Sequence, residues 1–79
     1  MESIQLFPNP FHSKLTITGL VPGNYQCRLL DLSGREVYNN KVMTDADRLQ
    51  LQMADIPNGY YLLELSGNER LYRQSVIRF

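Results

Sequence analysis

The stretch Arg48-Leu49-Gln50-Leu51-Gln52-Met53 alternates polar and apolar side chains at every position. Successive side chains of a β-strand point to opposite faces, so a period of two predicts a strand with one apolar face. Leu49, Leu51 and Met53 would face a core, and the polar side chains between them would face water. The stretch therefore predicts a sheet that buries one of its faces.

Similar short runs lie on both sides of this stretch, and each ends at Gly, Pro or Asn with the spacing of about 8–12 residues that is typical of sandwiches. The predicted strands are residues 4–7, 15–18, 25–31, 35–42, 48–53, 60–65 and 70–79. No window shows the 3.6-residue apolar period of a helix. Because an apolar sheet face needs a second sheet to cover it, the predicted fold class is all-β: a small Ig-like antiparallel β-sandwich of about seven short strands.

The apolar members of these runs form the predicted core, and the polar breaks between them form the predicted turns. Tyr61 should face inward and its neighbour Tyr60 outward, and Cys27 is predicted to be an inert core thiol. A hairpin turn is expected at Ser66-Gly67-Asn68. The predicted core comprises Leu6, Leu15, Ile17, Cys27, Leu29, Val37, Leu49, Leu51, Tyr61, Leu63, Leu65 and Ile77.

Length and charge limit the possible functions. The chain has 79 residues, with eight basic and eight acidic side chains that cancel. This balance disfavours a nucleic-acid surface or a polybasic membrane patch, and no apolar run approaches the ~20 residues of a membrane span. No signal peptide is visible at Met1-Glu2-Ser3. We therefore expect residues 1–79 to be a single domain excised from a larger protein.

Side chains that carry chemistry are sparse. The only cysteine is Cys27 and the only histidine is His12, so a disulfide or a cysteine-based zinc site within the chain is excluded. Asp45 and Asp47 have a spacing found in calcium loops, but Arg48 follows instead of further oxygen ligands. No nucleophile elbow is present. We expect neither a cofactor, nor a metal, nor catalysis.

Four turn-rich elements follow one another along the chain: Pro8-Asn9-Pro10-Phe11, then Asp31-Leu32-Ser33-Gly34-Arg35, then Ile56-Pro57-Asn58-Gly59-Tyr60-Tyr61, and a last run with Arg73 and Arg78. Each is ordinary turn chemistry by itself. In this order, across nearly the whole chain, they resemble the C-terminal sorting domain of the type IX secretion system. The last run departs from the family in carrying Arg where Lys is frequent, which keeps the charge but changes its geometry.

The resemblance implies a non-catalytic secretion signal on a cargo protein of the Bacteroidetes group, such as a hydrolase, a protease or an adhesin. Such a tail directs its N-terminal cargo across the outer membrane to the cell surface. The implied partners are the type IX translocon and outer-membrane shuttle and sortase proteins, which would contact a sandwich face or add a strand at an open edge. The implied recognition residues are Pro8, Asn9, Pro10, Phe11, Asp31, Gly34, Arg35, Gly59, Tyr61, Arg73 and Arg78.

Two alternatives remain open. An Ig-like accessory module could bind carbohydrate or protein beside a secreted polysaccharide hydrolase, and Tyr60, Tyr72 and Phe79 are its candidate contact residues. A ladder of exposed aromatic rings on one sheet face is the feature that such a module would need. A purely structural spacer is the third interpretation.

Overall fold

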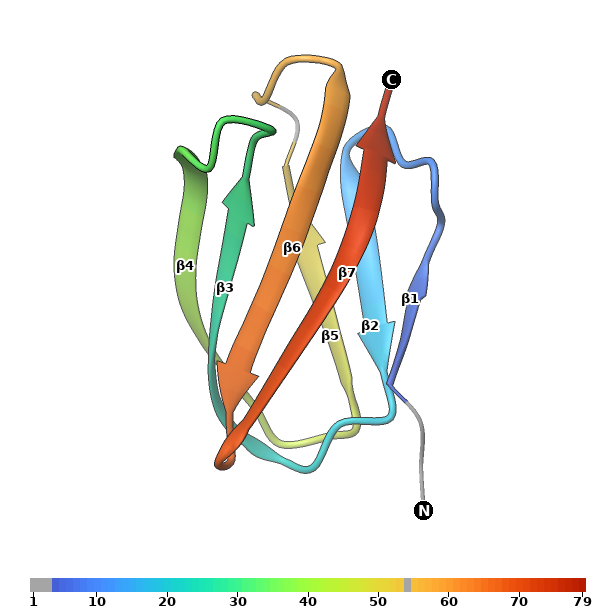
Figure 1. Ribbon diagram of the computed structural model, residues 1–79. Helices are drawn as coiled ribbons and strands as arrows, with labels where there is room; N and C mark the ends of the chain where they lie inside the picture. The colour runs from blue at the N-terminus through green and yellow to red at the C-terminus, as the bar shows by residue number, and fades with distance from the viewer. Residues whose placement is uncertain (1–3, 54) are drawn as a thin grey trace.

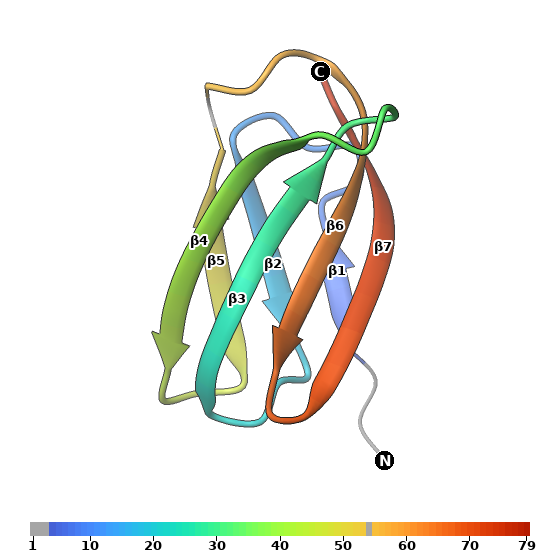
Figure 2. The same ribbon diagram turned by 60° about the vertical axis from the view of Figure 1, so that its left-hand side comes forward.

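The computed structural model describes residues 4–53 and 55–79. Its strands are β1 (Gln5–Phe7), β2 (Lys14–Thr18), β3 (Gly23–Leu30), β4 (Glu36–Thr44), β5 (Arg48–Gln52), β6 (Gly59–Gly67) and β7 (Arg70–Arg78). They form two antiparallel sheets, β1-β2-β5 and β4-β3-β6-β7, which face each other as the two layers of a sandwich (Figures 1 and 2). The predicted all-β sandwich is confirmed, and its strand boundaries differ from the prediction by at most two residues. No helix in the described residues is long and apolar enough to cross a membrane.

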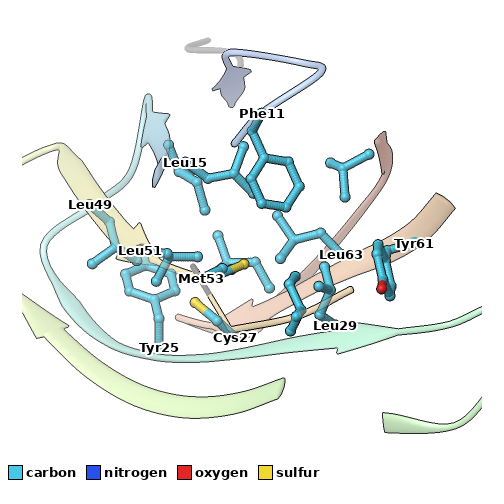
Figure 3. Packing of buried hydrophobic residues seen from close by; sticks show 14 of the residues in the cluster. Phe11, Leu15, Tyr25, Cys27, Leu29, Leu49, Leu51, Met53, Tyr61 and Leu63 are labelled. Carbon is cyan, nitrogen blue, oxygen red and sulfur yellow. The ribbon is translucent and has the colours of Figure 1, made fainter. Parts of the chain in front are cut away.

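The core fills the space between the two sheets, where alternate side chains of both sheets meet (Figure 3). Cys27 is fully buried, and this burial raises the pKa of its thiol to about 11. Figure 3 also shows Phe11, from the segment between β1 and β2, pointing into this space. Phe11 is fully buried, although it lies in a turn motif and is not among the predicted core residues.

The predicted core needs three corrections. Leu6 and Val37 pack against the core but are only partly buried. At Val37 the pairing of β3 with β4 shifts register, because Leu29 pairs with Tyr38 and Leu30 with Glu36, so Val37 is the extra residue of a β-bulge. Ile77 was predicted to face inward, but its neighbour Val76 is the buried residue.

The error at Ile77 has a simple physical cause. Both sets of alternating positions in β7 contain apolar side chains, with Leu71 and Ile77 on one face and Tyr72 and Val76 on the other. A period-two pattern by itself does not say which face is inside. Pairing of Tyr61 with Val76 across β6 and β7 decides it, since Tyr61 is a core residue.

The turn between β6 and β7 also differs from the prediction. It lies at Asn68 and Glu69, with φ angles of 51° and 61°, so the predicted turn at Ser66-Gly67-Asn68 is displaced toward the C-terminus. Two central residues with positive φ match the twist of a tight hairpin. Gly67 stays in β6, where a Cβ atom would lie 2.4 Å from the carbonyl oxygen of Asn24 and 2.5 Å from the ring of Tyr25. A side chain at this position would therefore collide with β3.

Candidate recognition surface

Most of the predicted motif residues meet at one end of the sandwich. Figures 1 and 2 show residues 8–13, the turn at residues 31–35, the loop at residues 55–58 and the last residues of β7 together at this end. We call it the motif end. Strand β1 begins at the opposite end, where the turn between β6 and β7 also lies (Figure 1). The fold therefore gathers elements that are far apart in the sequence.

The Pro-Asn-Pro-Phe element attaches to the outer edge of β7. Asn9 Oδ1 accepts the backbone N–H of Ile77 at 3.0 Å, and Asn9 Nδ2 donates to the carbonyl oxygen of Ser75 at 3.1 Å. The backbone continues the pairing, because the N–H of Phe11 donates to Ile77 at 2.8 Å and the N–H of Phe79 donates to Phe11 at 3.1 Å. The Asn9 amide thus replaces a backbone peptide group at the edge of the sheet.

The four residues of this element divide into two kinds. Pro8, Asn9 and Pro10 are exposed, and the bonds Phe7–Pro8 and Asn9–Pro10 are both cis. Phe11 is buried and forms a parallel bridge with Arg78 of β7. A buried aromatic ring therefore anchors an exposed proline pair to the C-terminal strand.

The predicted turn at Asp31 is confirmed. Asp31 Oδ1 accepts the hydroxyl of Ser33 at 2.6 Å, the N–H of Ser33 at 2.9 Å and the N–H of Arg35 at 3.0 Å. The hydrogen bond from the Ser33 hydroxyl is the main cause that lowers the pKa of the Asp31 carboxyl, followed by the bond from Arg35. Gly34 has a φ of 88°, which glycine adopts without a steric cost. Arg35 Nε lies 3.3 Å from Asp31 Oδ2.

Tyr61 and Arg78 hold the loop before β6. The buried Tyr61 donates its hydroxyl to the carbonyl oxygen of Pro57 at 2.5 Å, four residues upstream, in the manner of a tyrosine corner. Arg78 Nη1 donates to Asn58 Oδ1 at 2.6 Å, which links the end of β7 to the same loop. A hydrogen bond also joins His12 Nδ1 to the carbonyl oxygen of Phe79. Gly59, between these contacts, is half-buried.

Arg73 is the one predicted residue that lies away from the motif end. It stands in the middle of β7 on the outer face of its sheet, where its Nε is 2.9 Å from Glu64 Oε2. Glu64 Oε1 also accepts a hydrogen bond from Arg28 Nη1 at 2.8 Å, and Arg28 Nε donates to Glu36 Oε1 at 2.7 Å. The hydrogen bond from Arg28 is the main cause that lowers the pKa of the Glu36 carboxyl. Arg73 is therefore part of an ion-pair ladder that crosses all four strands of the sheet.

A shallow hollow of about 330 Å³ lies between the 31–35 turn and the loop before β6. Leu32 and Tyr60 stand at its rim with 83% and 64% of their surface exposed. Sequence reasoning singled out Tyr60 but missed Leu32, and it also missed Leu30 and Leu62 on the outer face beside the hollow. A signal was present: Leu29-Leu30 and Leu62-Leu63 are adjacent apolar pairs, which make both faces of a strand apolar. Within the described residues, no three His, Cys, Asp or Glu side chains group as possible metal ligands.

Comparison with known proteins agrees with the motifs. A search of curated proteins finds no match. The model of one protein family, described as the secretion system C-terminal sorting domain, matches residues 5–78. This match spans nearly the whole described chain and all four motif elements. The chain therefore belongs to the family of C-terminal sorting domains of the type IX secretion system, whose members mark proteins for the cell surface or for secretion.

Proposed function

We propose that this domain is the non-catalytic sorting signal of a larger exported protein. We also propose that the export machinery recognises the domain at the motif end. The cargo would precede β1, and the domain would direct it across the outer membrane to the cell surface. The type IX translocon and outer-membrane shuttle proteins are the proposed readers, and a surface sortase is the proposed later partner. The observation that carries this proposal is the convergence of the motif elements at one end of the sandwich.

The position of β1 supports the same proposal. A cargo domain joined before β1 would lie at the end of the sandwich opposite the motif end (Figure 1). Cargo attached there would not need to cover the motif end. One sorting domain could therefore serve cargo proteins of very different shape, as a general sorting signal must.

The proposed recognition residues divide by burial. Phe11, Tyr61, Asp31 and Gly34 shape the motif end through packing and turn hydrogen bonds. Pro8, Asn9, Pro10 and Arg35 are exposed, and Gly59 is half-buried at the hollow. Arg73 and Arg78 already bind Glu64 and Asn58 within the domain. We therefore propose that the two arginines act mainly by fixing β7.

A reporter experiment tests the proposed function. A fluorescent protein would carry a signal peptide in front and residues 1–79 behind, in a type IX-competent host and in a translocon-deficient strain. We expect surface or medium fluorescence in the first strain and periplasmic retention in the second. The same reporter without the domain should stay in the periplasm of both strains. Retention of the complete reporter in the competent host, with the domain folded, would refute the proposal.

The accessory binding module keeps two supporting observations, the exposed Tyr60 beside the hollow and the exposed Phe79 at the end of the chain. Its predicted aromatic ladder is weakened, because Tyr72 is partly buried and packs against the core, and so does Tyr38. Tyr25 and Tyr61 are core residues. Titration of the domain with plant polysaccharides separates the two functions, since saturable binding would favour the module and its absence favours the sorting signal.

A further inference from the structure

The outer faces of the two sheets differ in chemistry. On β2 and β5 the exposed side chains that point away from the core are polar, as Lys14, Gln50 and Gln52 show. This is the usual pattern for an antiparallel sheet with one face in water. The outer face of β4-β3-β6-β7 breaks the pattern. Met43 and Leu71 are exposed near the opposite end, each paired with a polar residue, whereas in the half nearest the motif end leucine, isoleucine and tyrosine side chains lie next to one another.

Strand register brings these apolar side chains together. Leu30 pairs with Leu62 across β3 and β6, and Tyr60 pairs with Ile77 across β6 and β7. Each is next in sequence to a core residue and therefore points to the opposite face. Leu32, in the adjoining turn, lines the hollow together with Tyr60. We call this surface the apolar face: Leu30, Leu32, Tyr60, Leu62 and Ile77.

Charged side chains border the apolar face, and they bind one another. The ion-pair ladder of Glu36, Arg28, Glu64 and Arg73 borders this face on the side away from the motif end, with N–O distances from 2.7 to 2.9 Å. Arg35 pairs with Asp31 beside Leu32. Paired charges give little attraction to an anionic lipid, a nucleic acid or an acidic peptide. The border therefore favours an uncharged, apolar ligand surface.

The size of the apolar face favours a transient contact. Stable protein interfaces use about 20–30 residues on each side, whereas this face has the five residues named above. A second copy of the domain, which could offer only the same small face, would be held weakly. A sugar ligand would need stacking rings and polar groups, but of the five tyrosines only Tyr60 projects from this face.

We propose that the apolar face is the surface with which the domain docks on an apolar patch of a protein of the export machinery. This inference rests on the proposed sorting function and names the contact within it. A small apolar contact bordered by paired charges should dissociate readily, which suits a domain that, in the proposed function, contacts several export proteins in turn. Residues at the centre of this face, above all Tyr60 and Leu62, would contribute most of the binding energy.

Export of matched variants tests the docking surface. Leu32→Ser with Tyr60→Ser changes two well-exposed side chains, so the fold should remain, and Leu62→Thr extends the change while keeping a strand-forming residue. The matched control is Met43→Thr with Leu71→Thr, two side chains on the outer face of the same sheet with 76% and 56% exposure. We expect at least about a tenfold loss of surface reporter for the first set and wild-type export for the control. Urea unfolding of each variant domain would confirm that it folds.

The outcomes separate the two proposals. If the unmodified reporter stays in the periplasm of the competent host, the proposed function fails. If it is exported and the folded apolar-face variants are exported equally well, the docking surface is wrong and the sorting function stands. A photo-crosslinking residue at position 32 should capture an export protein, and one at position 43 should not. Capture only of lipid, or only of a second copy of the domain, would overturn the docking proposal.

Discussion

The side-chain carbonyl of Asn9 accepts the backbone N–H of Ile77 at 3.0 Å, although 68 residues separate the two in sequence. The same side chain donates to the carbonyl oxygen of Ser75, so one amide satisfies two backbone groups of β7. Edge strands expose unpaired backbone groups that invite association with other chains. Asn9 and Phe11 cover part of this edge from within the domain.

Replacing Asn9 should loosen β7. Asn9→Ala removes both hydrogen bonds, and we expect the free energy of unfolding to fall by about 1–3 kcal/mol. Asn9→Asp keeps an acceptor for Ile77 but places a carboxylate oxygen against the carbonyl oxygen of Ser75, so it should also lower the stability. Urea unfolding measures the change, with Asn24→Ala at an exposed position of β3 as the control. Equal stability of Asn9→Ala and Asn24→Ala would show that the Asn9 contacts contribute nothing.

The adjacent tyrosines Tyr60 and Tyr61 provide a paired test of the tyrosine corner. Tyr61→Phe deletes the hydroxyl that binds Pro57, and we expect a loss of about 1 kcal/mol. Tyr60→Phe makes the identical chemical change at an exposed site and should alter stability by less than about 0.5 kcal/mol. Denaturant unfolding of both variants gives the comparison. A larger effect at Tyr60 than at Tyr61 would contradict the assigned roles.

Cys27 should be chemically silent in the folded domain. Burial raises the pKa of its thiol from 9.0 to about 11, so the neutral form is favoured when the chain is folded. Its contribution to stability is complete below the unfolded value and is lost as the pH rises from about 9 to about 11. A thiol reagent at about pH 8 should therefore react with urea-unfolded protein and not with native protein.

A second measurement isolates the titration of Cys27 from that of the tyrosines. Stability curves of the wild type and of Cys27→Ala, recorded from about pH 8 to about pH 11, should converge as the pH rises. Both chains contain the same five tyrosines, so their ionisation cancels in the difference. A constant difference across this range would show that the thiol does not titrate with folding.

Asp31 should make the domain sensitive to acid. Hydrogen bonds from the Ser33 hydroxyl and the Arg35 N–H lower the pKa of its carboxyl below the ordinary value of 3.8. The ionised carboxylate therefore stabilises the fold above this value, and its contribution is lost as the pH falls through the lower folded pKa. We expect Asp31→Asn to lose less stability than the wild type between about pH 5 and about pH 2.

A serine comparison checks the cause of this acid sensitivity. Ser33→Ala removes the main hydrogen bond that lowers the Asp31 pKa, so it should also flatten the pH dependence. Ser75→Ala, at an exposed position of β7, makes the same side-chain change away from the turn. Thermal unfolding across the acid range records both curves. A wild-type slope in Ser33→Ala would place the acid-sensitive group elsewhere.

Features that depend on neighbouring residues were predictable from the sequence. Contacts between residues far apart in the sequence were not. The alternation at residues 48–53 and the Asp31–Gly34 turn depend on neighbouring residues, and the structure confirms both. The inward direction of Tyr61 and the burial of Cys27 also follow from period-two patterns. These features need no knowledge of which strands pair.

The remaining features depend on pairings that a pattern does not encode. The orientation of Ile77 required the register with β6, and the role of Asn9 required its position beside β7. The turn lies at Asn68 and Glu69 rather than at Ser66-Gly67-Asn68, because Gly67 stays in β6, where it permits the close approach of Tyr25. Adjacent apolar pairs signalled the apolar face, but only the register shows that Leu30 meets Leu62.

The attachment of residues 8–11 to β7 means that the first and last parts of the domain sequence complete the motif end together. A precursor that is cut within β7, or whose synthesis stops before it, lacks Ile77 and Arg78 and leaves Asn9, Phe11 and Asn58 without their partners. Its cargo domain would be untouched and could fold normally. If the export machinery recognises the motif end, as proposed above, a copy damaged in β7 would fail to be exported even though its cargo domain had folded.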